Sequence, residues 1–207
     1  MLGGIGRFGD TELDILREIG NIGAGHAATA LSKLLGRPIE MAVPRASLVP
    51  FGEIAEKAGG EEAVVAAVYF RIEGDAPGNL FFLMPVASAE RLLAKLTGRE
   101  REAGAPFSEM EISALSEIAN ILAGSYLTSL SDFTKLTFLP TIPGFAVDMA
   151  GAILNVGLLQ FGVMGDCALL IETALREGSE EVGGRLFMIP DPDSFATIFT
   201  SLGVPPP

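Results

Sequence analysis

The spacing of apolar residues along the chain predicts an alternation of helices and strands. Long stretches with apolar residues three and four positions apart predict helices, and short β-branched or aromatic runs bounded by glycine and proline predict strands. The helices expected in this way cover about 11–35, 87–98, 108–133 and 193–203. The expected strands are 39–43, ending before Pro44, and two hairpins, 63–72 with 79–84 and 167–175 with 185–189.

Two of the predicted helices begin with a recognisable N-terminal capping pattern. Thr11 with Asp14, and Ser108 with Glu111, have the spacing of a capping box, in which a hydroxyl residue precedes a helix and an acidic residue follows three positions later. The shorter amphipathic helices end at glycine, as helices commonly do. Together these elements predict an α/β protein with a mostly antiparallel sheet.

The second half of the chain repeats the first. Residues 14–32 laid over residues 113–131, an offset of 99, give ten identities in nineteen positions. Further along, Pro85 matches Pro190 at an offset of 105. Self-similarity of this kind indicates a duplicated supersecondary unit.

The duplication predicts one domain over residues 1–207, made of two repeats at about 11–98 and 108–203 that are joined by the polar stretch 98–106. We expect an internal pseudo-two-fold axis, with the two long helices packed on the sheet.

Glu18 and Asn21 fall on one narrow face of the first long helix. Successive helical residues turn by about 100°, so with Asp14 at zero Glu18 lies near 40° and Asn21 near −20°. Gly25 lies near 20° on the same face. The second helix repeats this stripe with Ser113, Glu117, Asn120 and Gly124.

A second group of positions, on another side of the first helix, predicts its buried face. Five residues lie between roughly 80° and 160° around it and form a largely apolar stripe. They are Ile15, Ile19, Ile22, His26 and Ala30. On this prediction Glu18 and Asn21 point away from the core, and His26, the only histidine, is a core residue and not a metal ligand.

An exposed glutamate and asparagine are ordinary on a solvated helix face, so one such pair carries little information. The chain has only four asparagines, however, and two of them, Asn21 and Asn120, occupy equivalent places in the repeats. Helix propensity does not favour asparagine there. The recurrence therefore favours a functional surface over a solvated face.

The glycines of the first helix divide into two groups. Gly25 and Gly124 lie on the polar stripes, where a missing side chain lets a partner approach closely. Gly20 and Gly23 have Ala119 and Leu122 as counterparts and lie beside the apolar stripe, so we expect them to allow tight internal packing.

Composition narrows the class of function. A formal net charge of −12 argues against nucleic-acid binding, which needs a basic surface. The single cysteine, Cys167, excludes an internal disulfide and is expected to be inert packing. We find no secretory leader and no apolar run of about 20 residues, so we expect a cytoplasmic protein that binds no membrane. No cluster of residues predicts a metal site.

A longer motif joins each polar stripe to a proline. The pattern D/S-x3-E-x2-N-x22-P occurs twice with every spacing kept, as Asp14-Glu18-Asn21-Pro44 and as Ser113-Glu117-Asn120-Pro143. It resembles the motif of the CheC/CheX/FliY family of phosphatases that act on the chemotaxis response regulator CheY. CheX-type members retain one site, and FliY-type members carry a further C-terminal domain, so the resemblance is to the CheC branch.

The resemblance implies that the protein is an enzyme, a hydrolase of the phosphoaspartate on CheY. Asn21 and Asn120 would orient the attacking water, as a glutamine does in GTPases. Glu18 and Glu117 would pair with the active-site lysine of CheY, and CheY itself would supply the Mg²⁺. The prolines Pro44 and Pro143 would shape the strand that follows each helix.

A second function, binding without catalysis, also follows from the resemblance. Relatives of this kind bind CheD, a deamidase of chemoreceptor glutamines, and the chain would then act mainly as a regulatory partner. The segment 146–154 with Asp148, and the helix near 193–203, resemble the surface used for that contact. No spaced motif supports this second assignment.

Overall fold

The structure, a computed structural model, describes residues 10–98, 102, 104–161, 167–177 and 180–203. The helices are α1 (Asp10–Leu35), α2 (Ile54–Lys57), α3 (Val86–Thr97), α4 (Glu109–Thr134), α5 (Ala150–Phe161) and α6 (Pro192–Ser201), with a 3-10 turn, η1, at Phe51–Glu53. The strands are β1 (Glu40–Pro50), β2 (Val64–Gly74), β3 (Gly78–Pro85), β4 (Phe138–Pro140), β5 (Gly144–Met149), β6 (Cys167–Glu177) and β7 (Glu180–Pro190). The polar stretch 98–106 lies partly outside the described residues.

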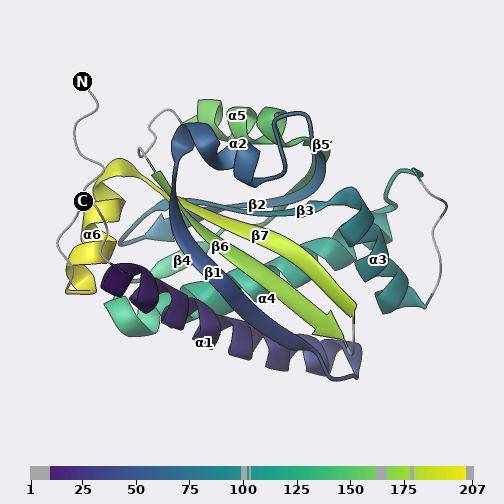
Figure 1. The fold of residues 1–207 in the computed structure, drawn as a ribbon, viewed down its shortest axis with the longest axis horizontal. Coiled ribbons are helices and arrows are strands. Elements are labelled where there is room, and N and C mark those ends of the chain that lie inside the picture. The colour runs from purple at the N-terminus through teal and green to yellow at the C-terminus, as the bar shows by residue number, and fades with distance from the viewer. Residues whose placement is uncertain (1–9, 99–101, 103, 162–166, 178–179, 204–207) are drawn as a thin grey trace.

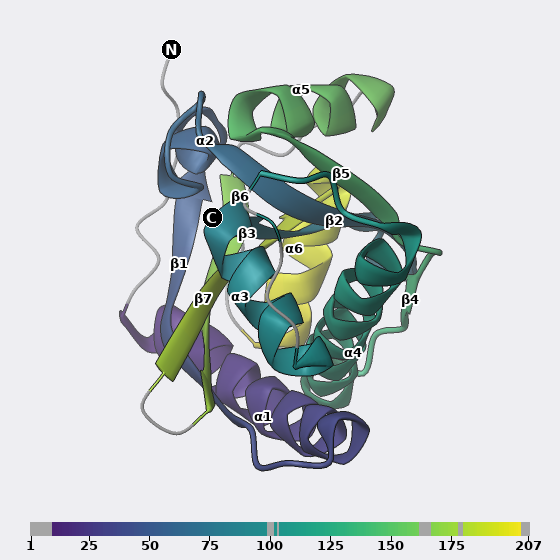
Figure 2. The same cartoon turned by 90° about the vertical axis from the view of Figure 1, so that its right-hand side faces the viewer.

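The strands form one antiparallel sheet between two layers of helices. The strand order is β1-β6-β7-β3-β2-β4, and β5 also pairs with β2. The long helices α1 and α4 lie on one face of the sheet, and α2 and α5 lie on the other (Figures 1 and 2). The α/β fold with a mostly antiparallel sheet that the sequence predicts is therefore confirmed.

The two repeats exchange their first strands. β1 comes from the first repeat but pairs with β6 of the second, and β5 of the second repeat pairs with β2 of the first. The hairpins β2–β3 and β6–β7 meet at the centre, where β3 pairs with β7. The described strands of the two repeats are thus interleaved in one sheet, around a pseudo-two-fold axis between β3 and β7.

The two exchanged strands pair in the same register. On β1, residues 45–50 run opposite residues 172–167 of β6, and on β5, residues 144–149 run opposite residues 69–64 of β2. The first segments differ by an offset of 99 and their partners by an offset of 103, with no slip between them. The duplication is therefore retained at the level of individual residue pairs.

The sheet divides the hydrophobic core in two. Val68 and Phe70 of β2 pack with the residues of α1 and α4, whereas Val65 and Ala67 pack with α2 and α5. This alternation follows from the pleat, because successive strand side chains point to opposite faces. Both faces of the central strands are buried, which explains why β3 is a continuous apolar run.

Helices α1 and α4 meet through residues with little or no side chain on α1. A Cβ atom placed on Gly23 would lie 2.8 Å from Cδ1 of Tyr126 and 3.1 Å from its Cα, so only glycine fits this crossing. Ala24 and Ala27 are also fully buried. The expectation that Gly20 and Gly23 serve internal packing is confirmed.

The predicted buried face of α1 is wrong by about a quarter turn. Leu16, Ile19 and Leu31 are buried together with the glycines and alanines, whereas Ile15, Ile22 and Ala30 are only partly buried. His26 is exposed, not a core residue. The hydrophobic pattern failed here because the packed face consists largely of glycine and alanine, which allow close approach of backbones but contribute little apolar signal.

One of the two predicted capping boxes is present. Ser108 is the N-cap of α4, its hydroxyl accepts from the backbone N–H of Glu111, and the Glu111 carboxylate accepts from the backbone N–H of Ser108. The box expected at Thr11 is wrong, because α1 already includes Asp10 and Thr11 lies inside the helix. At the end of α3, Gly98 is the C-cap with φ of 64°, as predicted.

Two strands extend further than the sequence suggested. β1 continues through Pro44 instead of ending before it, and β7 begins at Glu180 instead of near residue 185. Gly184 lies within β7, where a Cβ atom would come 2.6 Å from Cε2 of Phe82. This glycine therefore makes room for an aromatic ring of the neighbouring strand and does not mark a turn.

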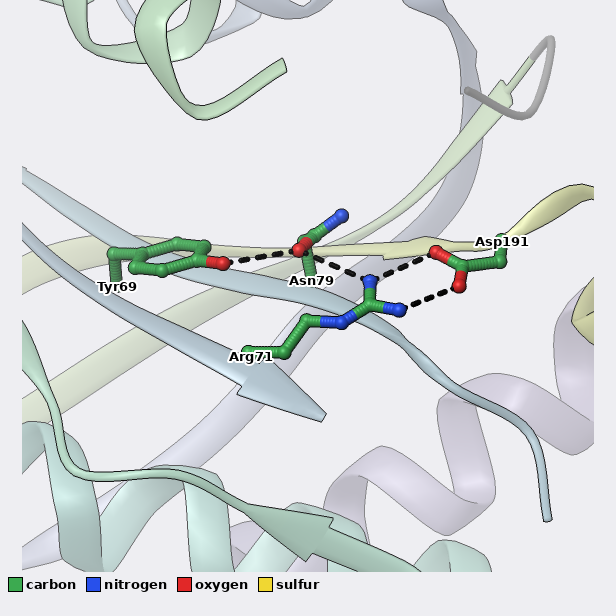
Figure 3. A network of polar contacts seen from close by, with 4 residues as sticks. All are labelled: Tyr69, Arg71, Asn79 and Asp191. Atoms are coloured by element: carbon green, nitrogen blue, oxygen red, sulfur yellow. Dashed lines mark hydrogen bonds and ion pairs between the residues drawn. The ribbon is translucent and has the colours of Figure 1, made fainter. Parts of the chain in front are cut away.

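A polar cluster joins the first hairpin to the start of α6 (Figure 3). Arg71 donates to both carboxylate oxygens of Asp191 at 2.8 and 2.6 Å, and Asn79 Oδ1 accepts from Arg71 at 3.3 Å and from the Tyr69 hydroxyl at 3.1 Å. Asp191 is the N-cap of α6, but its side chain makes no capping bond. The carboxylate instead ties the last helix of the second repeat to a strand of the first.

A matched pair of substitutions tests the packing of α1. Gly23→Ala should lower the free energy of unfolding by about 1–3 kcal/mol, because its Cβ atom overlaps Tyr126. Gly25→Ala meets no atom within 4 Å. It should therefore raise the free energy of unfolding by roughly 0.5–1 kcal/mol, the helix propensity difference. Chemical denaturation of both variants measures this, and equal shifts of one sign would contradict the packing described.

The two tyrosines provide a pH test of burial. Burial raises the pKa of Tyr69 and of Tyr126 to about 12. The unfolded chain loses its phenolic protons nearer pH 10, so the stabilisation is complete below about pH 10 and is lost as pH rises towards 12. Between about pH 9 and pH 11 we expect a loss on the order of 1 kcal/mol, most of it from the deeply buried Tyr126, because solvent screens the half-buried Tyr69. Tyrosinate absorbance, which no tryptophan obscures in this chain, should remain low in the native protein near pH 10.

Candidate functional site

The first polar stripe lies on the exposed face of α1. Glu18, Asn21 and Gly25 are all exposed, as the helical angles predicted. Asp14 is exposed one turn earlier and forms an ion pair with Arg17, with Nη2 and Oδ1 at 2.9 Å. Glu18 and Asn21 thus stand one turn apart on the same face of α1.

The second polar stripe lies on α4 in the same arrangement. Ser113, Glu117 and Asn120 are exposed, and Gly124 is partly exposed. In the described part of the chain, no heavy atom other than nearby backbone of the same helix lies within 4 Å of a Cβ atom built on Gly25 or on Gly124. Neither glycine is therefore required by packing within the chain, and both leave open surface beside the asparagine.

The two stripes face away from the contact between their helices. Gly23 lies two residues from Gly25 and therefore about 160° from it around α1. Tyr126 lies two residues from Gly124 and has the same relation to the stripe of α4. Because Gly23 and Tyr126 form the helix crossing, the stripes are on separate outer surfaces.

A β-bulge explains the proline of the motif. On β1, Val43 and Pro44 stand opposite the single residue Thr173, so the strand carries one extra residue. In the second repeat the three residues 141–143 stand opposite residues 70 and 71, again with one residue in excess. Proline has no N–H to donate and is tolerated at bulges and on edge strands. Both prolines thus lie in a bulge, and that they shape the strand stays a prediction; the side chain of Pro44 lies outside what the structure describes.

The first bulge fixes the side chain of Asn21. The backbone N–H of Val43 donates to Asn21 Oδ1 at 3.2 Å. A backbone N–H can bond only to an acceptor, so this bond identifies the oxygen of the carboxamide and turns its NH₂ group away from β1. The carboxamide of Asn21 is thus oriented by the strand that follows its helix.

The second bulge differs from the first in its central residue. Val43 is 3% exposed, whereas Ile142, its counterpart, is 92% exposed. Within the described ranges Asn120 has no hydrogen bond equivalent to that between Asn21 and Val43. The two stripes therefore have the same helix and the same extra strand residue but different contacts to the bulge.

The helix residue equivalent to the one that contacts the first bulge also differs between the repeats. A Cβ atom on Gly20 would lie 3.4 Å from both γ-carbons of Val43, an ordinary van der Waals distance, so Val43 packs closely against α1 at this glycine. In the second repeat Ala119 stands in place of the glycine and is fully buried, whereas Ile142 is exposed. The two repeats therefore differ in both the bulge residue and the helix residue.

The other predicted site residue, Asp148, lies on β5 and not on the long helices that carry the two stripes. It is exposed on β5, and its Oδ1 accepts from the backbone N–H of Met149 at 2.7 Å. Asp148 pairs with Val65, whereas α6 follows Pro190, which pairs with Gly78 at the far end of the β2–β3 hairpin. The segments 146–154 and 193–203 therefore do not form one surface, because their strand ends lie roughly 20 Å apart along the sheet.

The described part of the chain shows neither a metal-binding cluster nor a membrane-spanning helix. It holds no group of three or more His, Cys, Asp or Glu residues placed to bind a metal ion. No helix of that part is long and apolar enough to cross a bilayer. The side chain of Cys167, expected to be inert packing, lies outside what the structure describes.

Sequence reasoning found the helix residues of the site but not those of the bulge. Val43 and Ile142 were not predicted, although each immediately precedes the proline of its motif. The constant spacing of 22 residues between asparagine and proline was the available signal. In the first repeat this spacing coincides with the contact between Asn21 and the residue before the proline.

The fold and the stripes define a class: a duplicated α/β protein with a Glu/Asn pair on each of two long helices. A model of the CheC-like family matches residues 12–48 and 110–147, one helix and its following strand in each repeat. The chain is 43% identical over 198 residues to the CheY-P phosphatase CheC of Bacillus subtilis, covering 94% of this chain and 95% of that one. The chain belongs to the CheC-like family.

Two further similarities involve flagellar proteins. The flagellar motor switch phosphatase FliY of Bacillus subtilis is 31% identical over 122 residues, which cover 59% of this chain and 32% of FliY. The crystal structure of FliY from Thermotoga maritima superimposes with a TM-score of 0.72 at 21% identity, covering 95% of this chain and 98% of that one. At that identity the likeness confirms the fold alone.

Proposed function

We propose that the protein is a chemotaxis phosphatase that hydrolyses the phosphoaspartate of the response regulator CheY, with one site on α1 and one on α4. The observation that carries this proposal is the exposed Glu/Asn pair, present at equivalent places on two helices. The name of the Bacillus subtilis relative, a CheY-P phosphatase with 43% identity, supports the substrate.

Asn21 and Asn120 are assigned the positioning of water. Asn21 Oδ1 accepts one bond from Val43, but a carbonyl oxygen has two lone pairs and the NH₂ group has two hydrogens. The carboxamide can therefore accept a hydrogen from the attacking water and donate to a phosphoryl oxygen. Holding water in line with the leaving oxygen is the main task in such a reaction, since phosphoryl transfer depends chiefly on positioning and charge stabilisation.

Glu18 and Glu117 are assigned the docking of the target. Each is exposed one turn before its asparagine, so a lysine of CheY that meets the carboxylate would align the phosphoaspartate with the carboxamide. The stripes offer too few carboxylates for a Mg²⁺ site of their own. We propose that the Mg²⁺ which neutralises the phosphoryl charge belongs to CheY.

A second proposed role is the binding of the deamidase CheD at β5. In the described part of the chain β5 pairs only with β2, so its other edge is open. Val147, Asp148 and Met149 are exposed along it. An open strand edge with alternating apolar and acidic side chains can accept another chain. This surface is distinct from both stripes, so the two roles are compatible.

Kinetics can separate the proposed role of the asparagines from that of the glutamates. Asn21→Ala with Asn120→Ala should lower the maximal rate about a hundredfold, roughly 2.7 kcal/mol of barrier, because water is no longer positioned. Glu18→Ala with Glu117→Ala should also weaken apparent affinity, because an ion pair with the target is lost. Phosphate release from phosphorylated CheY gives both parameters.

The single-repeat variants complete this experiment. Because the stripes lie on separate surfaces, each site should turn over alone, and the losses from Asn21→Ala and Asn120→Ala should be roughly additive. Near-complete loss from Asn21→Ala alone would indicate one composite site. Full activity of the double asparagine variant would show that the stripes are not catalytic.

The open surface beside each asparagine gives a steric test. Gly25→Leu with Gly124→Leu should leave the protein folded, since neither added side chain meets an atom within 4 Å at its Cβ and leucine favours helix. Activity should nevertheless fall to the spontaneous rate, because the leucines block the approach of CheY. The control is Gly25→Ala with Gly124→Ala, whose methyl groups should have a much smaller effect. Normal turnover by the folded leucine variant would exclude these faces as docking surfaces.

A further inference from the structure

Ile142 is a highly exposed large apolar residue at the second bulge. Its counterpart Val43 lies at the first bulge, where its N–H donates to the asparagine of the first stripe. Val43 is 3% exposed and Ile142 is 92% exposed. The second bulge therefore displays an apolar side chain at a place where the first bulge buries one.

The residues around Ile142 hold it in a fixed position. The backbone N–H of Thr141 donates to the carbonyl of Arg71 at 2.8 Å, and the Thr141 hydroxyl accepts from the backbone N–H of Arg71 at 3.0 Å. On the other side Pro143 restricts the backbone, and Gly144 pairs with Tyr69. Arg71 is itself anchored by Asp191. A side chain displayed on a fixed backbone loses little conformational freedom when it is bound.

A second exposed apolar residue lies on the same stripe. Met110 is 80% exposed in the first turn of α4, seven residues before Glu117 and therefore only about 20° from it around the helix. Its counterpart in the first repeat is Thr11. The second repeat thus has exposed apolar side chains at two places where the first repeat has a hydroxyl residue and a buried valine.

We infer that Ile142, supported by Met110, is a docking contact for the phosphorylated receiver domain at the second site. This inference rests on the proposed function, since that domain is the occupant of the neighbouring Glu117/Asn120 stripe. An apolar contact beside a charged and a hydrogen-bonding group gives the second site a docking chemistry that the first site lacks. Ile142 is a binding residue and takes no part in positioning water.

The test uses a background in which only the second stripe is open. Gly25→Leu blocks the first stripe, and Ile142→Ser is added to it. The probe is the receiver domain of CheY loaded with Mg²⁺ and beryllofluoride, a stable mimic of the phosphoaspartate. We expect Ile142→Ser to raise the Kd for this probe, and the KM for phosphorylated CheY, about tenfold while kcat changes less than about twofold.

The control is Leu34→Ser in the same background. Leu34 is 55% exposed near the end of α1, on the side of that helix opposite the first stripe. Leu34→Ser therefore measures the effect of removing an exposed apolar side chain that lies away from the stripes. An unchanged Kd for Ile142→Ser, an equal rise for Leu34→Ser, or no binding by the Gly25→Leu parent would each overturn the inference. If binding depends on Ile142 but the asparagine variants retain full turnover, the docking contact stands and the proposed catalysis fails.

Discussion

The exchange of edge strands between the two repeats is the constraint on which the rest of the structure depends. β1 completes the hairpin of the second repeat, and β5 completes that of the first, so neither repeat can bury its sheet alone. The exchange also fixes the long helices, because α1 leads directly into β1 and α4 into β4 and β5. Each helix is held against a sheet whose nearest hairpin belongs to the other repeat. The position of each polar stripe is therefore set by pairing across the pseudo-two-fold axis.

The bulges connect this architecture to the proposed chemistry. A regular antiparallel strand uses its N–H groups in the ladder, whereas the extra residue of a bulge leaves its groups free. In the first repeat the freed N–H of Val43 orients the carboxamide of Asn21. An exposed asparagine would otherwise sample several rotamers, which would weaken its ability to position water. The proline of the motif lies in this bulge, next to the residue whose N–H makes the contact.

The sequence predicted most of the fold and the helix residues of the site, for identifiable physical reasons. Hairpins such as β2–β3 were predictable because apolar runs bounded by glycine and proline have few other solutions. Glu18 and Asn21 were found because they recur at a fixed offset. The buried face of α1 was mispredicted because Gly23 and Ala24 pack closely without a hydrophobic pattern. The opposite burial of Val43 and Ile142 could not be predicted, because both are β-branched apolar residues that directly precede the proline of their motif.

The two copies show how a duplicated site can diverge at the bulge while its helix residues stay the same. The register of the exchanged strands keeps both bulges in equivalent places, but β1 runs through the first bulge as one strand, whereas the second bulge separates β4 from β5. In the first copy Val43 is buried against Gly20 and its N–H reaches Asn21. In the second copy Ile142 is exposed, and Ala119 stands in place of the glycine. One copy therefore has an anchored carboxamide and the other an exposed apolar side chain, although their Glu/Asn pairs are the same.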